Sequence, residues 1–127
     1  MQPSVRILVV DDFEPWRRFA CSTLRKKPGL QVVGEASNGL EAFQKAVELE
    51  PDLILLGIGV PSANGIEAAR RIREMVPEAK IIFLSEESSA DVVQEAMSFG
   101  ASAYVFKTMA ASDLFTAVDT VMSGMKL

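Results

Sequence analysis

The sequence predicts an α/β protein in which five helices cover both faces of a doubly wound, five-stranded parallel sheet. Short apolar runs of strand length alternate five times with segments whose apolar residues recur at helical spacing. The central run lies within residues 52–61, between Pro51 and Pro61, and is rich in Leu and Ile, as expected of a strand buried on both faces. Strict alternation of strands and helices builds a parallel sheet with helices on both sides.

The strand predictions rest on runs rich in branched apolar residues. Besides the central run, the predicted strands span residues 5–10, 30–35, 79–84 and 103–106. No internal repeat or composition shift divides the chain, so the sequence predicts one domain.

The helix predictions rest on apolar positions three and four residues apart. Pro15 is acceptable in a first helical turn, and Pro28-Gly29 ends the first helix. Asn38 and Ser112 are the expected N-caps of the second and last helices. The predicted inward faces are, helix by helix, Trp16, Phe19, Ala20, Thr23 and Leu24; Ala42, Phe43, Ala46 and Val47; Ile66, Ala69, Ile72 and Val76; Val92, Val93, Ala96 and Met97; and Leu114, Phe115, Val118, Val121 and Met122.

Composition and charge exclude several classes of function. The chain has 127 residues, 49% of them apolar and 24% charged, as in soluble globular domains. No apolar run reaches the about 18 residues of a membrane span, so no membrane contact is expected. A net charge of −4 argues against direct nucleic-acid binding, and the absence of histidine excludes histidine triads and histidine metal sites. The single cysteine, Cys21, is expected to be a packed, inert thiol in a cytoplasmic protein.

Polar residues follow the carboxyl ends of four predicted strands. They are Asp11 and Asp12 after the first, Ser85 after the fourth and Lys107 after the fifth, while Gly57 ends the third. Two carboxylates suit a hard cation, and a hydroxyl and an ammonium suit a phosphate. Each residue alone has an ordinary structural explanation. Their convergence at one sheet edge, where ligands bind in open α/β folds, indicates a site that handles phosphate and a cation.

The order of these residues resembles that of the receiver domain of bacterial response regulators. The resemblance runs from about Arg6 to the end of the last helix and is carried by Asp11-Asp12, the 52–61 stretch, Asn64-Gly65-Ile66, Ser85 and the segment 100–107. Segments 33–36 and 101–107 are most similar to receivers that precede a LuxR-type helix-turn-helix domain. The resemblance implies a flavodoxin-like (CheY-like) fold with strand order 2-1-3-4-5. It also implies that residues 1–127 are a single receiver domain, the N-terminal part of a longer regulator.

The resemblance also assigns roles to individual residues. In the family, a sensor histidine kinase's phosphoryl group is transferred to an aspartate on the third strand. By resemblance, the Mg²⁺ ligands are Asp11, Asp12 and the carbonyl of Gly59, the phosphoryl-binding hydroxyl is Ser85, the neutralising cation is Lys107 and the aromatic ring that reports activation is Tyr104.

Gly57 stands at the position of the family's phosphoacceptor aspartate. Phosphoryl transfer needs an oxygen nucleophile in line with the phosphorus, and glycine has none. Asp52 is no substitute, because it lies near the opposite end of the strand at roughly 3.3 Å per residue. We therefore predict no aspartyl phosphate and no autophosphatase activity. We also predict weakened Mg²⁺ binding and a Lys107 side chain paired with Asp12 or Asp11.

Two further departures concern the residues that follow Ser85 and Lys107. Glu86 and Glu87 replace a usual small residue, and Glu86 could fill the missing acceptor's place beside Lys107, although solvated loop acids are the simpler interpretation. Thr108 stands where the family usually has proline or aspartate after a peptide bond that is typically cis. A cis bond before threonine would cost about 3 kcal/mol and would have to be held by its surroundings.

Partner surfaces follow from the same resemblance. It implies a sensor histidine kinase as partner, and a homodimer or other protein contact through the face formed by residues 91–100, 103–107 and 112–122. The basic residues of the first helix and just beyond it are expected to form a solvated outer face, with a docking surface for a partner as the alternative: Arg17, Arg18, Arg25, Lys26 and Lys27.

Three functions remain open at this point. The first is a phosphorylation-independent receiver that regulates transcription through protein contacts or dimerisation, and reaches DNA only through a domain absent from this chain. The second is an ordinary phospho-switch receiver whose aspartate has been substituted. The third is a Mg²⁺-dependent phosphohydrolase with Asp11 or Asp12 as nucleophile. The receiver-like spacing argues against the third, so we expect no enzyme activity.

Overall fold

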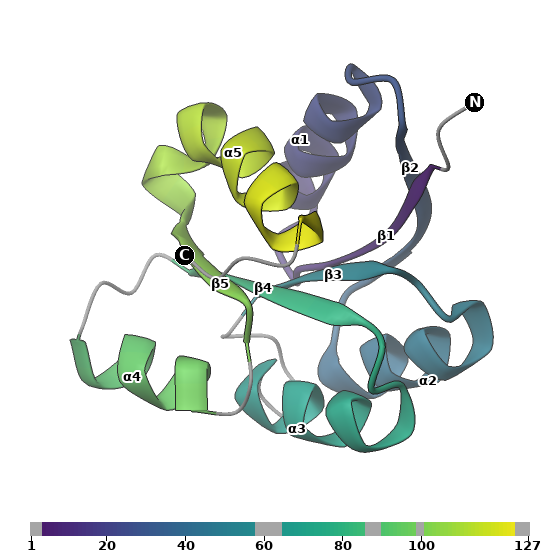
Figure 1. Ribbon diagram of the computed structural model, residues 1–127, viewed down its shortest axis with the longest axis vertical. Helices are drawn as coiled ribbons and strands as arrows, with labels where there is room; N and C mark the ends of the chain where they lie inside the picture. Colours follow the sequence, from purple (N-terminus) through teal and green to yellow (C-terminus); the bar gives the residue numbers. More distant parts are fainter. Residues whose placement is uncertain (1–3, 58–64, 86–89, 99–100, 124–127) are drawn as a thin grey trace.

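A computed structural model gives the structure of residues 4–57, 65–85, 90–98 and 101–123. Within these residues, five strands alternate with five α-helices (Figure 1). In chain order they are β1 (Val5–Val10), α1 (Glu14–Arg25), β2 (Leu30–Ala36), α2 (Gly39–Leu49), β3 (Leu53–Gly57), α3 (Gly65–Met75), β4 (Lys80–Ser85), α4 (Ala90–Ser98), β5 (Ala103–Phe106) and α5 (Ala110–Met122), with a short 3-10 turn, η1 (Lys107–Met109), before α5.

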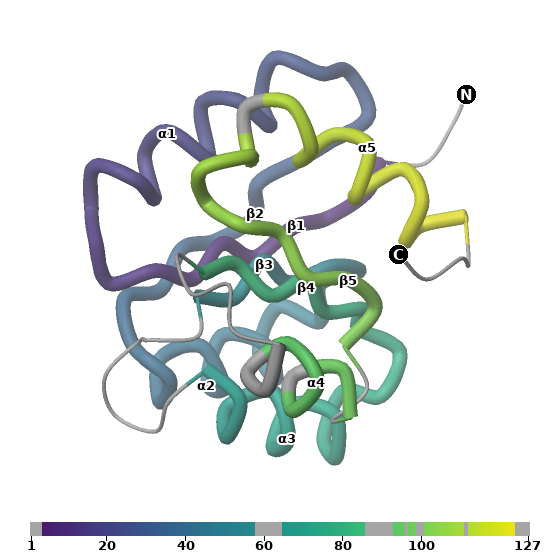
Figure 2. Tube along the Cα trace, turned by 90° about the vertical axis from the view of Figure 1, so that its left-hand side faces the viewer, coloured from purple at the N-terminus to yellow at the C-terminus, as the bar shows by residue number. Residues whose placement is uncertain are grey.

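The strands form one parallel sheet in the order β2-β1-β3-β4-β5. This order confirms the predicted flavodoxin-like topology. Helices α1 and α5 cover one face of the sheet, and α2, α3 and α4 cover the other (Figures 1 and 2). None of the helices in the described part of the chain is long and apolar enough to cross a membrane.

The sheet separates two apolar cores. Along β1, Ile7 and Val9 face the core under α1 and α5, whereas Leu8 and Val10 face the core under α2 and α3. Every residue of β3 is buried. The continuous apolar run of the sequence is therefore explained by burial on both faces, as predicted.

Two predicted inward residues are exposed instead. Phe19 of α1 and Val47 of α2 are each 41% exposed. On each helix the adjacent positions, Ala20 in α1 and Ala46 in α2, are fully buried. Successive residues of a helix point about 100° apart, so a stripe centred on these small residues turns the next large side chain outward. The Phe19 ring packs against Trp16, with ring centroids 6.2 Å apart.

The two predicted helix caps have different outcomes. Asn38 caps α2 as predicted: its side-chain oxygen accepts a hydrogen bond from the Glu41 backbone N–H at 2.8 Å. The Glu41 carboxylate accepts a hydrogen bond in return from the N–H of Ser37, one residue before the cap, at 2.7 Å, a variant of the capping box. The Ser112 prediction is wrong, because η1 leads directly into α5 two residues earlier. The Ser112 hydroxyl instead donates to the Met109 carbonyl within the first turn.

Candidate functional site

Strand register brings the predicted site residues to one edge of the sheet. Val10 pairs with Leu56 across β1 and β3, Gly57 pairs with Leu84 across β3 and β4, and Ser85 lies opposite the last residue of β5. Asp11 and Lys107 follow β1 and β5 directly, so both belong to the same edge. The predicted convergence at the carboxyl edge of the sheet is therefore present.

Asp11 is the buried centre of this edge. Its side chain is 1% exposed, and its Oδ1 accepts a hydrogen bond from the Phe13 N–H at 2.9 Å. Its Oδ2 lies 2.6 Å from the Lys107 ammonium. Asp12, the second acid of the pair, is exposed. The expected pairing of Lys107 is confirmed, and Asp11 is its partner.

Gly57 leaves room for this arrangement. A Cβ built on Gly57 would lie 2.8 Å from Asp11 Oδ2 and 3.4 Å from the Val10 carbonyl oxygen. The Asp11 carboxylate thus takes up the space in which a side chain at position 57 would begin. Any larger residue there requires the carboxylate to move.

The Lys107 ammonium is enclosed from a second side by an aromatic ring. Its Nζ lies 4.9 Å from the centre of the half-buried Trp16 ring, within range of a cation–π interaction. The Lys107 side chain is 15% exposed. The cation therefore sits between the Asp11 carboxylate and the face of Trp16.

Arg17 corrects the prediction of a solvated basic face, whereas Lys27 forms an exposed ion pair. The Arg17 side chain is only 17% exposed; its Nε pairs with Glu35 Oε1 at 3.0 Å, and its Nη1 donates to the Asp11 carbonyl at 2.9 Å. Lys27 pairs with Asp119 at 2.8 Å. Both cations find acceptors on other elements of the fold, which the sequence positions alone do not show.

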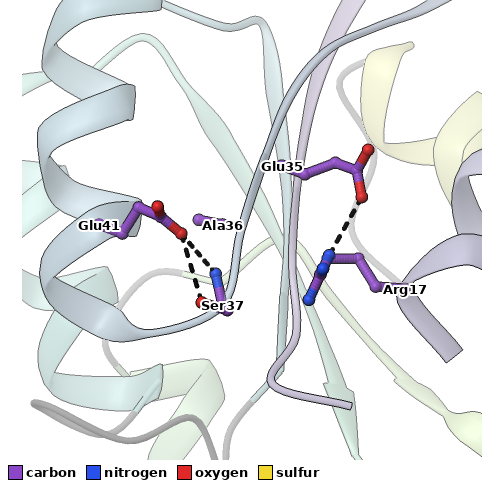
Figure 3. Close-up of a pocket in the computed structure, with 5 residues that line it drawn as sticks. All are labelled: Arg17, Glu35, Ala36, Ser37 and Glu41. Carbon is purple, nitrogen blue, oxygen red and sulfur yellow. Dashed lines mark hydrogen bonds and ion pairs between the residues drawn. The ribbon is translucent and has the colours of Figure 1, made fainter. Parts of the chain in front are cut away.

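A pocket of about 230 Å³ lies beside this network, between α1, β2 and the start of α2. Figure 3 shows Arg17 reaching from α1 toward Glu35 on β2, and Glu41 turned toward Ser37. Both acids bond within the lining, to Arg17 and Ser37 respectively. The pocket is framed by these structural contacts, and Arg17 connects it to the Asp11 backbone.

Cys21 lies on the buried face of α1. Its side chain is 2% exposed. Burial raises the pKa of the thiol from 9.0 to about 11, and the neighbouring negative charge of Glu35 adds to the rise. Because the thiolate is the reactive form, this environment agrees with the predicted packed and inert thiol.

The remaining site residues have the following positions. Ser85 is buried at the end of β4, and Tyr104 is half-buried on β5 with its ring 5.4 Å from that of Phe106. Among the described residues no peptide bond is cis, so the bond before Thr108 is trans, unlike the bond typical of the family. Five residues with predicted roles lie outside the described backbone or side chains: Gly59, Glu86, Glu87, Val92 and Ala96.

The described residues do not fit a Mg²⁺ site in this arrangement. Mg²⁺ requires octahedral oxygen ligands, usually one or two carboxylates with water and phosphate oxygens. Here the buried carboxylate oxygen of Asp11 already faces an ammonium, and Gly57 supplies no ligand. No group of three or more potential metal-binding side chains occurs among the described residues.

Trp16 and Arg17 are site residues that sequence reasoning missed. Trp16 was assigned to the core and Arg17 to the surface, yet they reach Lys107 and the Asp11 backbone respectively. Their place in the first turns of a helix that directly follows the acidic pair is the one signal that could have found them.

Comparisons with known proteins agree with this geometry. Residues 7–119 match the family model of the response regulator receiver domain. The chain is 38% identical over 120 residues to the transcriptional regulatory protein LnrK of Bacillus subtilis, and 35% identical over 120 residues to LiaR of the same organism. Each alignment covers 94% of this chain, but 54% of LnrK and 57% of LiaR. The chain thus spans just over half the length of these relatives.

Solved structures show the same similarity. A LuxR-family two-component response regulator from Aurantimonas sp. SI85-9A1 superposes with a TM-score of 0.93 at 30% identity, covering 97% of this chain and 88% of that one. The response regulator domain of CheB from Thermotoga maritima superposes with a TM-score of 0.88 at 32% identity, covering 94% of this chain and 97% of the other.

Proposed function

The chain belongs to the family of response regulator receiver domains, and we propose that it is a degenerate receiver that works without phosphorylation. In this proposal it serves as an interaction or dimerisation module of a LuxR-type transcriptional regulator. The observation that carries the proposal is Gly57 at the end of β3, where the Asp11 carboxylate lies in the space that a side chain at position 57 would need.

The chemistry of phosphoryl transfer supports this proposal. An aspartyl phosphate forms only when a carboxylate oxygen attacks the phosphorus in line, and position 57 has no oxygen to offer. The neighbouring carboxylate of Asp11 is buried, and both its oxygens have partners, Phe13 N–H and Lys107. We therefore assign no catalytic role to this corner.

The proposed action is through protein contacts. Receivers of this family normally interact with histidine kinases and dimerise, and we place the contact of this chain on the α4–β5–α5 face. Half-buried Tyr104 and Phe106 supply apolar surface on β5. We assign DNA binding to a domain outside this chain, since the matches cover 54% and 57% of the two relatives named as transcriptional regulatory proteins. A transcriptional role places the protein in the cytoplasm.

Intact mass after incubation with acetyl phosphate and Mg²⁺ tests the proposal. We expect the parent chain to keep its mass and Gly57→Asp to gain one phosphoryl group. Gly57→Asn is the matched control, because it fills the same space without a nucleophile and should stay unmodified. A phosphorylated parent chain would overturn the proposal, because another residue would then be the acceptor.

A second candidate is a receiver that has lost only its acceptor and keeps the rest of its switch. Buried Ser85 and Lys107 remain at the carboxyl edge with Asp11, which favours this candidate. Two-dimensional NMR of Gly57→Asp with beryllofluoride distinguishes the two. A shift of the Tyr104 signals upon addition supports an intact switch, and unchanged Tyr104 signals support the permanently phosphorylation-independent module.

A further inference from the structure

The buried oxygen of Asp11 has a single source of neutralisation. Among the described residues, the Lys107 ammonium at 2.6 Å is the ion-pair partner of Asp11 Oδ2, and this oxygen accepts no hydrogen bond. Opposite charges this close attract strongly in a buried setting, and a buried carboxylate left without a partner charge is costly. This position therefore needs a cation at all times.

The glycine is what allows the cation to come from the chain itself. With a Cβ at position 57, Asp11 Oδ2 would have a neighbour at 2.8 Å and would have to turn away. Without one, the carboxylate lies across the end of β3, where Lys107 from beyond β5 reaches it. Gly57 therefore has two consequences: it supplies no acceptor oxygen, and its missing side chain leaves the space in which the ion pair between Asp11 and Lys107 forms.

The surroundings of the ammonium suit an organic cation better than a hydrated metal ion. The face of Trp16 lies 4.9 Å from Lys107 Nζ. An aromatic face attracts an ammonium but gives no oxygen ligand, whereas Mg²⁺ gives up its water reluctantly and needs six oxygens. A metal ion at Asp11 would have to displace Lys107 from both the carboxylate and the ring.

We propose that Lys107 serves as the resident cation at the carboxyl edge of the sheet. Its ammonium, held between the Asp11 carboxylate and the Trp16 ring, excludes Mg²⁺ from Asp11. This inference deepens the proposed function and rests on it, since it explains how the degenerate site is kept in one state. It makes the corner independent of the Mg²⁺ concentration. Lys107 is therefore a residue that determines specificity against divalent cations.

Trp16 gives a direct readout, because it is the single tryptophan of the chain and lies over the cation. Its fluorescence is followed while the chain is titrated with Mg²⁺ and, separately, with Mn²⁺, whose paramagnetism quenches nearby fluorophores. We expect no saturable change for the parent chain. Lys107→Met keeps the approximate length of the side chain but not its charge. For this variant we expect saturable binding of Mg²⁺ and Mn²⁺, at least about tenfold tighter than the weakest binding that the titration of the parent chain can detect.

Lys27→Met is the matched control. Lys27 also pairs with an aspartate, Asp119, at 2.8 Å and lies 5.4 Å from the centre of an aromatic ring, that of Phe115. It lies away from the carboxyl edge, so its removal should leave the titration as flat as in the parent chain. The double variant Lys107→Met with Asp11→Asn should lose the binding gained by Lys107→Met.

Saturable binding by the parent chain with the affinity of Lys107→Met overturns the inference, as does a flat response in both. Where Lys107→Met fails to fold, Mn²⁺-induced NMR line broadening in the unmodified chain decides. Unbroadened Phe13 and Gly57 amides support the inference, and selective broadening of both overturns it. These outcomes are separable from those of the phosphorylation test: a chain that binds Mg²⁺ but keeps its mass contradicts only the cation exclusion.

Discussion

The two ends of β1 both hold charged residues, but they hold them in different ways. At the amino end, the Arg6 N–H donates to Asp52 Oδ2 at 2.9 Å. The Arg6 guanidinium donates to the carbonyls of Leu49 and Glu50 at 2.7 and 3.0 Å. Every one of these bonds has a backbone atom as one partner. They close the link between α2 and β3 and follow from the course of the chain.

At the carboxyl end, the central contact joins two side chains. Asp11 Oδ2 faces the Lys107 ammonium in a nearly buried pair, and the space for it comes from Gly57 on a third segment. Such a contact is not needed to close any strand or turn. The comparison teaches that the amino end is ordinary strand-end structure, whereas the carboxyl end keeps a specialised charge arrangement.

The largest expected effect comes from removing the buried acid. Asp11→Ala leaves the Lys107 ammonium without its carboxylate, and we expect a loss of about 3 kcal/mol in the free energy of unfolding. Asp52→Ala at the other end removes one acceptor from a backbone N–H and should cost about 1 kcal/mol. Urea unfolding followed by circular dichroism measures both. Equal losses would contradict the distinction between the two ends.

Arg17 gives the next largest effect. Arg17→Met removes the pair with Glu35 and the hydrogen bond to the Asp11 carbonyl, both made by a side chain that is only 17% exposed, and should cost about 2 kcal/mol. The adjacent Arg18 is the matched control, because its side chain is 77% exposed and, within the described part of the chain, its ion pair is with Glu14 along the helix. Arg18→Met should change stability by less than about 0.5 kcal/mol in the same assay. A similar loss in both variants would show that Arg17 is surface charge after all.

The pH dependence of stability tests the environment of α1 at this end. The folded chain holds the Cys21 proton up to a pKa of about 11, whereas the unfolded thiol loses it near 9.0. Stability is therefore complete below pH 9 and falls as the pH rises toward 11. By pH 10, the parent chain should lose about 1 kcal/mol more than Cys21→Ala does. Identical pH profiles of the two chains would show that the thiol is not buried as described.

The smallest effect concerns the helix cap near the same edge. Asn38→Ala removes the acceptor of the Glu41 N–H and should cost about 1 kcal/mol in thermal or urea unfolding. Ser112→Ala, at the predicted cap that is absent from the structure, should change stability by less than about 0.5 kcal/mol. A larger loss of stability for Ser112→Ala than for Asn38→Ala would instead support Ser112 as the N-cap of α5.

The sequence pattern was sufficient for the strands and for the edge at which the polar residues meet, the resemblance supplied the sheet order, and the pairing of Lys107 was predicted with Asp12 or Asp11. Strands buried on both faces leave continuous apolar runs, and residues that directly follow parallel strands must meet at one edge. With glycine at position 57, the sequence left Asp12 and Asp11 as partners of Lys107, and the burial of Asp11 decides between them.

The errors arose where tertiary packing decides. Periodicity gives the centre of a helix face but not its width, so Phe19 and Val47 were placed inside although small neighbours fill the core. The contacts of Trp16 and Arg17 depend on how α1 lies against the sheet, which no local pattern encodes. The start of α5 depends on η1, which leads into the helix at Ala110, so Ser112 lies inside the first turn and not at the cap.

A crystal structure of the unmodified chain grown with saturating Mg²⁺ tests the central claim most directly. The account predicts Lys107 Nζ within about 3 Å of the Asp11 carboxylate, Trp16 over the ammonium and no metal ion at Asp11 or Asp12. A hydrated Mg²⁺ held by both aspartates, with Lys107 turned away, would contradict it.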